Sequence, residues 1–192
     1  MSPLTIGMAL IFSLLIPALG YIFLGALVGI LFLIGYFGGF ILWFILPQRA
    51  SYFSLRVPYW LTFIAFLLLH KTEENATRFF QVLSDRITGV PVPELSPILI
   101  VGLLVLPIGA WILGPFLLKR GYDFGYFLAW TLFSSMGITE LAHFVFPLMT
   151  SKPYGYFPGM ASVLVLAPLA WWGIWRMVCG SSTNSPSCLR EA

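Results

Sequence analysis

The chain has 192 residues, of which 59% are hydrophobic and only 9% are charged. Soluble domains carry about 25% charged residues, so this composition excludes an ordinary soluble protein and indicates one that lies mainly within a bilayer. The net charge of +3 comes from Lys and Arg residues scattered between apolar stretches. No basic patch is dense enough to bind nucleic acid, and we expect no nucleic-acid partner.

Long apolar stretches follow one another along the chain and predict about six membrane-spanning helices. A spanning helix needs about 20 predominantly apolar residues, whereas a strand of a membrane barrel needs about ten alternating ones. The stretches are too long and too continuous for barrel strands, so we expect an all-α, polytopic helical bundle. The predicted spans are residues 4–19, 21–46, 57–80, 97–118, 123–149 and 157–178.

The boundary between the first two spans is the weakest, because only Pro17 and the pair Gly20-Tyr21 mark it. Residues 4–46 could instead form a short or re-entrant segment followed by one long span. The first stretch lacks a basic leader and a small-residue cleavage site, so we expect a retained span.

We expect a single transmembrane domain over residues 1–179 and a short, disordered tail over residues 180–192. An even number of spans places both termini on one side of the membrane. The excess of Lys and Arg on that side predicts that both termini are cytoplasmic.

Two clusters of ionisable residues interrupt the apolar sequence. Residues 70–74 read His-Lys-Thr-Glu-Glu at the end of an apolar stretch, and residues 140–143 read Glu-Leu-Ala-His inside another. The chain has two histidines, and each lies close to carboxylates. Ionisable side chains are costly at membrane depth and usually mark a functional site. The sequence therefore predicts a polar site within the membrane.

The spacing allows the two clusters to share one site. Helical positions three and four residues apart lie on one face, so His70 can face the same way as Glu73 and Glu74, and Glu140 the same way as His143. At 1.5 Å per residue, both clusters lie about 20–30 Å along helices that run in the same direction. Their depths match, although the sequence does not show that the two helices are neighbours.

Glu and His at helical spacing are typical of carboxylate-bridged dimetal sites in helical bundles. Fewer ligands would suit one zinc ion with an open position, where water is acidified for attack on an amide or ester. The candidate metal is therefore zinc, or a di-iron or dimanganese centre. We predict that Glu73 or Glu74 acts as catalytic base or bridging ligand. The predicted metal ligands are His70, Glu73, Glu74, Glu140 and His143.

The same residues allow other functions, so whether the chain is an enzyme stays open at this point. Without a metal they could form a proton relay or an ion-coupled transport path, or pair with each other and with Arg78 to lock helices together. Repeated glycines at four-residue spacing and the lack of a soluble domain also fit an accessory subunit of a larger membrane complex. The expected partners are membrane lipids, with either other membrane subunits or a second copy of the chain.

Residues 70–74 resemble the defining motif of the HXXEE family of bacterial integral membrane proteins. That family also has a later polar segment ending in His, here residues 140–143, and an aromatic-x-Pro-Gly segment before its last helix, here residues 156–159. Ala142 departs from the pattern, because a second His or an Asn is expected beside His143. The resemblance implies an intramembrane polar site with a metal-binding or enzymatic role, hydrolase-like or oxidase-like, in a bacterial inner membrane. It does not supply a reaction.

Overall fold

The computed structural model describes residues 1–46, 50–94 and 96–180. Within these ranges every regular element is helical, and no strand is found. Six of the described helices are long and apolar enough to cross a membrane, which confirms the predicted all-α bundle of six spans. The predicted tail, apart from Gly180, lies outside the described residues. The spans are Pro3–Leu24, Ala26–Ile45, Tyr52–Ala76, Pro97–Lys119, Asp123–Met149 and Met160–Cys179.

The first and last spans are single helices, α1 (Pro3–Leu24) and α11 (Met160–Cys179). The second span comprises α2 (Ala26–Phe32), a wider π-helical segment η1 (Leu33–Phe37) and α3 (Gly38–Ile45).

The third span is built in the same way as the second, with a π-helical segment in its middle. It comprises α4 (Tyr52–Ile64), the π-helical η2 (Ala65–His70) and α5 (Lys71–Ala76). Two short segments, α6 (Phe79–Leu83) and η3 (Ser84–Thr88), follow it outside the span.

The fourth span contains α7 (Pro97–Ile100), the π-helical η4 (Val101–Val105) and α8 (Leu106–Lys119). The fifth is the most broken. It contains α9 (Asp123–Gly137), the 3₁₀ turn η5 (Thr139–Leu141), α10 (Ala142–Val145) and the 3₁₀ turn η6 (Phe146–Met149).

Helix α9 is the central helix of the bundle, and α3, α8 and α11 all pack against it. Its residues are almost all buried from Phe127 to Gly137, whereas the outer spans expose many Leu, Ile and Val side chains. A spanning helix satisfies its own backbone hydrogen bonds, so its outer face needs only apolar side chains. The buried aromatic side chains around α9 therefore form the core, and lipid is expected around the rest.

Two glycines bring the second span directly against α9. A Cβ atom on Gly39 would lie 2.8 Å from Cα of Thr131, and one on Gly35 would lie 2.6 Å from Oγ of Ser135. Both distances are shorter than van der Waals contact, so a larger residue at either position would displace its neighbours, and at Gly39 the neighbour is backbone. The four-residue spacing of Gly35 and Gly39 thus serves helix packing within the chain.

The predicted break between the first two spans was misplaced. Helix α1 continues through Pro17 and Tyr21 to Leu24, and the chain turns at Gly25 with φ of +90°. Glycine adopts this conformation without steric penalty. The second span then returns along α1, and a Cβ on Gly29 would lie 2.7 Å from Cβ of Tyr21. The first two spans form a tight helical hairpin, which excludes a re-entrant segment followed by one long span.

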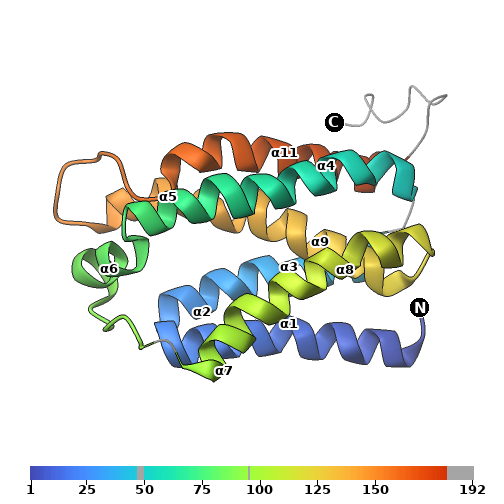
Figure 1. Ribbon diagram of the computed structural model, residues 1–192, viewed down its shortest axis with the longest axis horizontal. Coiled ribbons are helices and arrows are strands. Elements are labelled where there is room, and N and C mark those ends of the chain that lie inside the picture. Colours follow the sequence, from blue (N-terminus) through green and yellow to red (C-terminus); the bar gives the residue numbers. More distant parts are fainter. Residues whose placement is uncertain (47–49, 95, 181–192) are drawn as a thin grey trace.

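The two ends of the bundle are formed by different elements (Figure 1). The N-terminus and the end of α11 lie at one end, as an even number of spans requires. Helices α5 and α6 and the loop between η6 and α11 gather at the opposite end. Both ionisable clusters belong to that second end.

Candidate metal centre

The third span brings His70 and Glu74 to the interior of the bundle. His70 is the last residue of the π-helical segment η2, and Glu74 lies one turn later in α5. Both side chains are buried, and His70 has no exposed surface. Single π-helical turns inside α-helices are frequent at functional sites, because the wider turn re-aims the side chains that follow it.

The fifth span brings Glu140 and His143 to the same place through a break in the helix. Helix α9 ends at Gly137, whose carbonyl accepts a hydrogen bond of 2.6 Å from the indole of Trp171 in α11. The chain continues through η5, which contains Glu140, into α10, which contains His143.

Four side chains converge between these two spans. One ligand atom from each lies within 4.8 Å of all the others. Oε2 of Glu140 is 3.1 Å from Nε2 of His70 and 3.1 Å from Nε2 of His143. Oε1 of Glu74 is 3.4 Å and 3.8 Å from the same two nitrogens. We call His70, Glu74, Glu140 and His143 the His/Glu centre.

The other nitrogen of each imidazole is held by an oxygen. Nδ1 of His143 lies 2.5 Å from the carbonyl oxygen of Pro158, which can only accept, so Nδ1 carries the proton. Nδ1 of His70 lies 2.9 Å from Oγ of Ser162. The Ser162 hydroxyl donates to the carbonyl of Gly159 at 3.1 Å, so it accepts from His70 Nδ1. In a neutral ring, each Nε2 therefore has a free lone pair.

These lone pairs are directed at negative charge. Both Nε2 atoms face the carboxylates of Glu74 and Glu140. Nε2 of His70 forms no hydrogen bond with either, whereas Nε2 of His143 lies at hydrogen-bond distance, 3.1 Å, from Oε2 of Glu140. Hydrogen-bond acceptors that face one another repel, so the centre is stabilised by a proton shared between an imidazole and a carboxylate, or by a metal ion. Metal-binding histidines commonly donate their second N–H to a carbonyl or another oxygen, as both rings do here.

Glu73 lies outside the His/Glu centre. Its carboxylate accepts hydrogen bonds from the backbone N–H groups of Ala161 at 3.1 Å and Ser162 at 2.7 Å, and from the hydroxyl of Tyr156 at 2.5 Å. Free N–H groups in the first turn of a helix favour a negative partner. In this structure Glu73 therefore caps α11, and Glu74 is the member of the pair that lies in the His/Glu centre. The ligand or base role expected of Glu73 or Glu74 stays a prediction.

The reason for this difference is helical geometry. Residues three and four positions after His70 flank it on opposite sides, about 100° apart around the helix axis. Glu74 turns toward the fifth span, whereas Glu73 turns toward α11.

Lys71 has a role that was not predicted from the sequence. Its ammonium lies 2.5 Å from Oε2 of Glu74 and above the ring of Phe66, 5.1 Å from the ring centre. The i,i+3 spacing of Lys71 and Glu74 was the available sign of this pair. Arg78, which the i,i+4 spacing would allow to pair with Glu74, follows the end of α5 and adopts a left-handed conformation with φ of +52°. Among the described residues, no ion pair joins Arg78 to Glu74.

Fold and site together define a polytopic helical membrane protein with a buried His/Glu centre between its third and fifth spans. Comparison with protein-family models, with curated proteins and with solved structures finds no match to this chain. The resemblance to the HXXEE family therefore stays a prediction, as do the partners and the orientation of the termini.

Proposed function

We propose that this chain is an integral membrane protein whose His/Glu centre binds one divalent transition-metal ion. The arrangement of the two imidazoles is the observation that supports this most. Each ring donates Nδ1–H to an oxygen and presents Nε2 to the same two carboxylates. Imidazole and carboxylate donors suit zinc, and they also suit iron and manganese.

The distances suggest different roles for the four groups. His70, His143 and Glu140 form the closest set, because Oε2 of Glu140 is 3.1 Å from both Nε2 atoms. Three protein ligands with an open position are typical of catalytic zinc sites. Glu74 faces the same point from slightly farther away, and Lys71 holds its second oxygen. Glu74 is thus placed to act as a fourth ligand or as a base beside the open position.

One ion fits this donor set better than two. Dimetal sites in helical bundles use a Glu from each of two helices in addition to two Glu-x-x-His pairs. Here Glu73 is engaged with the start of α11, which leaves two carboxylates and two imidazoles in the described part of the chain. The di-iron or dimanganese alternative would need a further carboxylate ligand.

A bound metal ion would polarise a carbonyl group and acidify water at its open position, which favours hydrolysis of an amide or ester. Glu74 would accept the proton, because its Oε1 faces the centre while Lys71 fixes its Oε2. Iron in the same ligand set would favour oxidase-like chemistry instead.

Elemental analysis of the detergent-purified protein tests the proposal. We expect one equivalent of zinc, iron or manganese in the unmodified protein, and loss of that metal in His143→Ala and Glu140→Gln. Glu73→Gln is the matched control, because it changes a neighbouring carboxylate outside the centre and should keep its metal. Size-exclusion chromatography shows whether each variant remains folded. A metal-free unmodified protein would overturn the proposal and favour a proton relay.

A further inference from the structure

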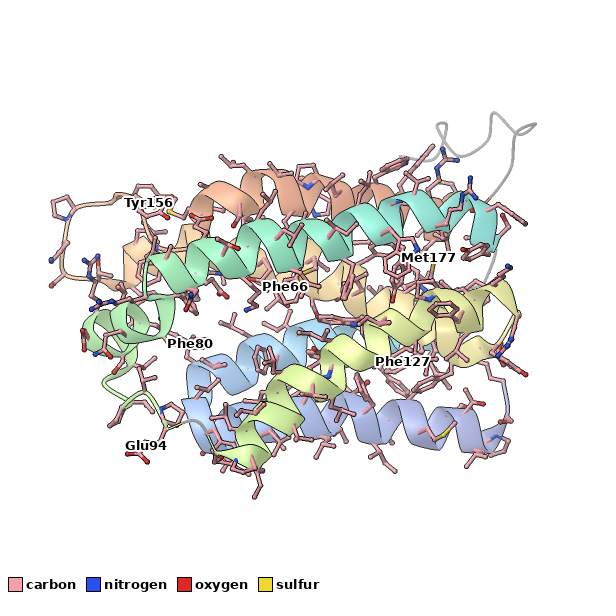
Figure 2. All side chains as sticks on the ribbon, viewed as in Figure 1. Phe66, Phe80, Glu94, Phe127, Tyr156 and Met177 are labelled. Carbon is pink, nitrogen blue, oxygen red and sulfur yellow. The ribbon has the colours of Figure 1, made fainter. Side chains whose placement is uncertain are left out.

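A cavity of about 270 Å³ lies beside the His/Glu centre, and its wall is mainly apolar. The fourth span provides the largest share of its lining, and the second, third and fifth spans provide most of the rest. Phe66, which lines the cavity from the third span, and Phe80, which lines it from α6, are both marked in Figure 2. Other apolar members of the wall are Leu31, Phe32, Leu103, Ile108 and Trp111.

One part of the cavity wall is polar and belongs to the centre itself. Glu140 lines the cavity, and so does Lys71, which is paired with Glu74. Ser135 and Thr139 lie in the same wall. Oγ of Ser135 is buried and has no hydrogen-bond partner among the described residues. A buried hydroxyl without a partner is costly, so a ligand that supplies an oxygen or N–H there would be stabilised.

The cavity also reaches the surface of the bundle. Leu104, in the fourth span, lines it and is 48% exposed, and Val92 lines it and is 43% exposed. Leu104 belongs to a membrane-spanning helix, so its exposed surface faces lipid. An apolar molecule could therefore enter from the bilayer without crossing water.

We propose that this cavity binds the apolar chain of a single-chain lipid, whose polar end lies at Lys71, Ser135 and Glu140. The inference rests on the proposed function for the chemistry at the polar end, and it names the substrate class of that site. Small-molecule sites usually measure about 300–1,000 Å³, so a cavity of about 270 Å³ has room for one narrow chain. Burial of that chain among apolar side chains supplies the affinity.

The test uses a fatty-acid methyl ester whose chain carries a photoreactive diazirine, added to the full chain in lipid nanodiscs. Labelled peptides identified by mass spectrometry should include cavity-lining residues of the fourth span. Leu104→Trp and Ile108→Trp fill the cavity, and we expect labelling of its wall to fall about tenfold, the equivalent of 1.4 kcal/mol in affinity. Val105→Trp is the matched control, because Val105 adjoins Leu104 and is 55% exposed but does not line the cavity. Labelling should be unchanged there.

Equal labelling in the unmodified protein, Leu104→Trp and Ile108→Trp would overturn the inference. Metal content measured on the same samples separates the two proposals. If metal is bound and the cavity-filling substitutions do not reduce labelling, the metal centre is supported and the lipid site is contradicted. If labelling depends on the cavity but no metal is bound, the lipid site is supported and the metal centre is contradicted.

Discussion

The imidazole rings of His70 and His143 meet edge to face, with ring centres 5.0 Å apart and an angle of 85° between their planes. The two residues belong to different spans, yet both rings are oriented by the same short segment. Ser162 holds His70, and Pro158 holds His143. The segment that leads into the sixth span, together with the first turn of that span, therefore orients both imidazoles of a centre whose four side chains all come from the third and fifth spans.

Removal of the Ser162 hydroxyl should weaken metal binding without unfolding the protein. Ser162→Ala removes the acceptor that orients His70, and loss of such outer partners typically lowers metal affinity about 10–100-fold. Competition with a chromophoric chelator measures the change. Ser13→Ala, which alters a buried serine of α1 far along the chain from the centre, should leave the affinity unchanged. Equal affinities for Ser162→Ala and the unmodified protein would contradict the orienting role.

Loss of the Glu73 carboxylate should lower stability while metal content stays the same. Glu73→Ala removes the acceptor for two backbone N–H groups of α11, and loss of a helix cap costs about 0.5–2 kcal/mol. For a chain of this size that corresponds to a fall in Tm of roughly 1–8 °C. Thermal unfolding followed by tryptophan fluorescence measures it. Glu94→Ala, in an exposed loop, is the control, and an equal Tm for both variants would argue against the cap.

Two Gly→Ala substitutions should differ in their effects on stability. A Cβ on Gly39 would lie 2.8 Å from Cα of Thr131, and overpacking of this kind typically costs about 1–3 kcal/mol. A Cβ on Gly109 would meet nothing within 4 Å, and alanine is a better helix former than glycine by about 1 kcal/mol. Gly39→Ala should therefore lower Tm, and Gly109→Ala should maintain or raise it. The reverse order would show that the second span does not pack tightly on α9.

The hydroxyl of Tyr156 should lose its proton at a higher pH than an ordinary tyrosine. Partial burial, the hydrogen bond to Glu73 and the negative charge of Glu73 raise the pKa of Tyr156 from 10.0 to about 12. Because the folded-state pKa is raised, the bond stabilises the fold fully below pH 10 and is lost as the pH rises toward 12. Difference absorbance between the unmodified protein and Tyr156→Phe isolates this group. An ordinary tyrosine titration in the difference curve would mean that the bond to Glu73 does not form.

The six spans were predictable because lipid imposes one strong requirement on the chain. Each spanning helix must be apolar for about 20 residues, and that pattern can be recognised in the sequence without knowledge of tertiary contacts. The position of the first turn was not predictable in this way. Gly20, Gly25 and Gly29 look alike in the sequence, and only the packing of α2 on α1 decides that Gly25 takes the positive φ.

The depth of the candidate site in the membrane was predictable from the sequence, but the exact set of residues in it was not. A fixed rise per residue placed both clusters at one height, and the structure brings His70, Glu74, Glu140 and His143 together. Helical spacing could not distinguish Glu73 from Glu74, because both flank His70. That choice depends on where α11 begins, which is tertiary information. The sequence pattern also could not predict that the third and fifth spans are neighbours.

The cap formed by Glu73 has a consequence for biosynthesis. A membrane protein is made from its N-terminus, so the residues that provide all four ligand groups enter the membrane before α11 has been synthesised. Until α11 arrives, His70 lacks the Ser162 hydroxyl and Glu73 lacks its backbone partners. The centre can take its final geometry only after the last span has inserted. Truncated or stalled chains would therefore expose carboxylates and imidazoles that the finished protein holds in place.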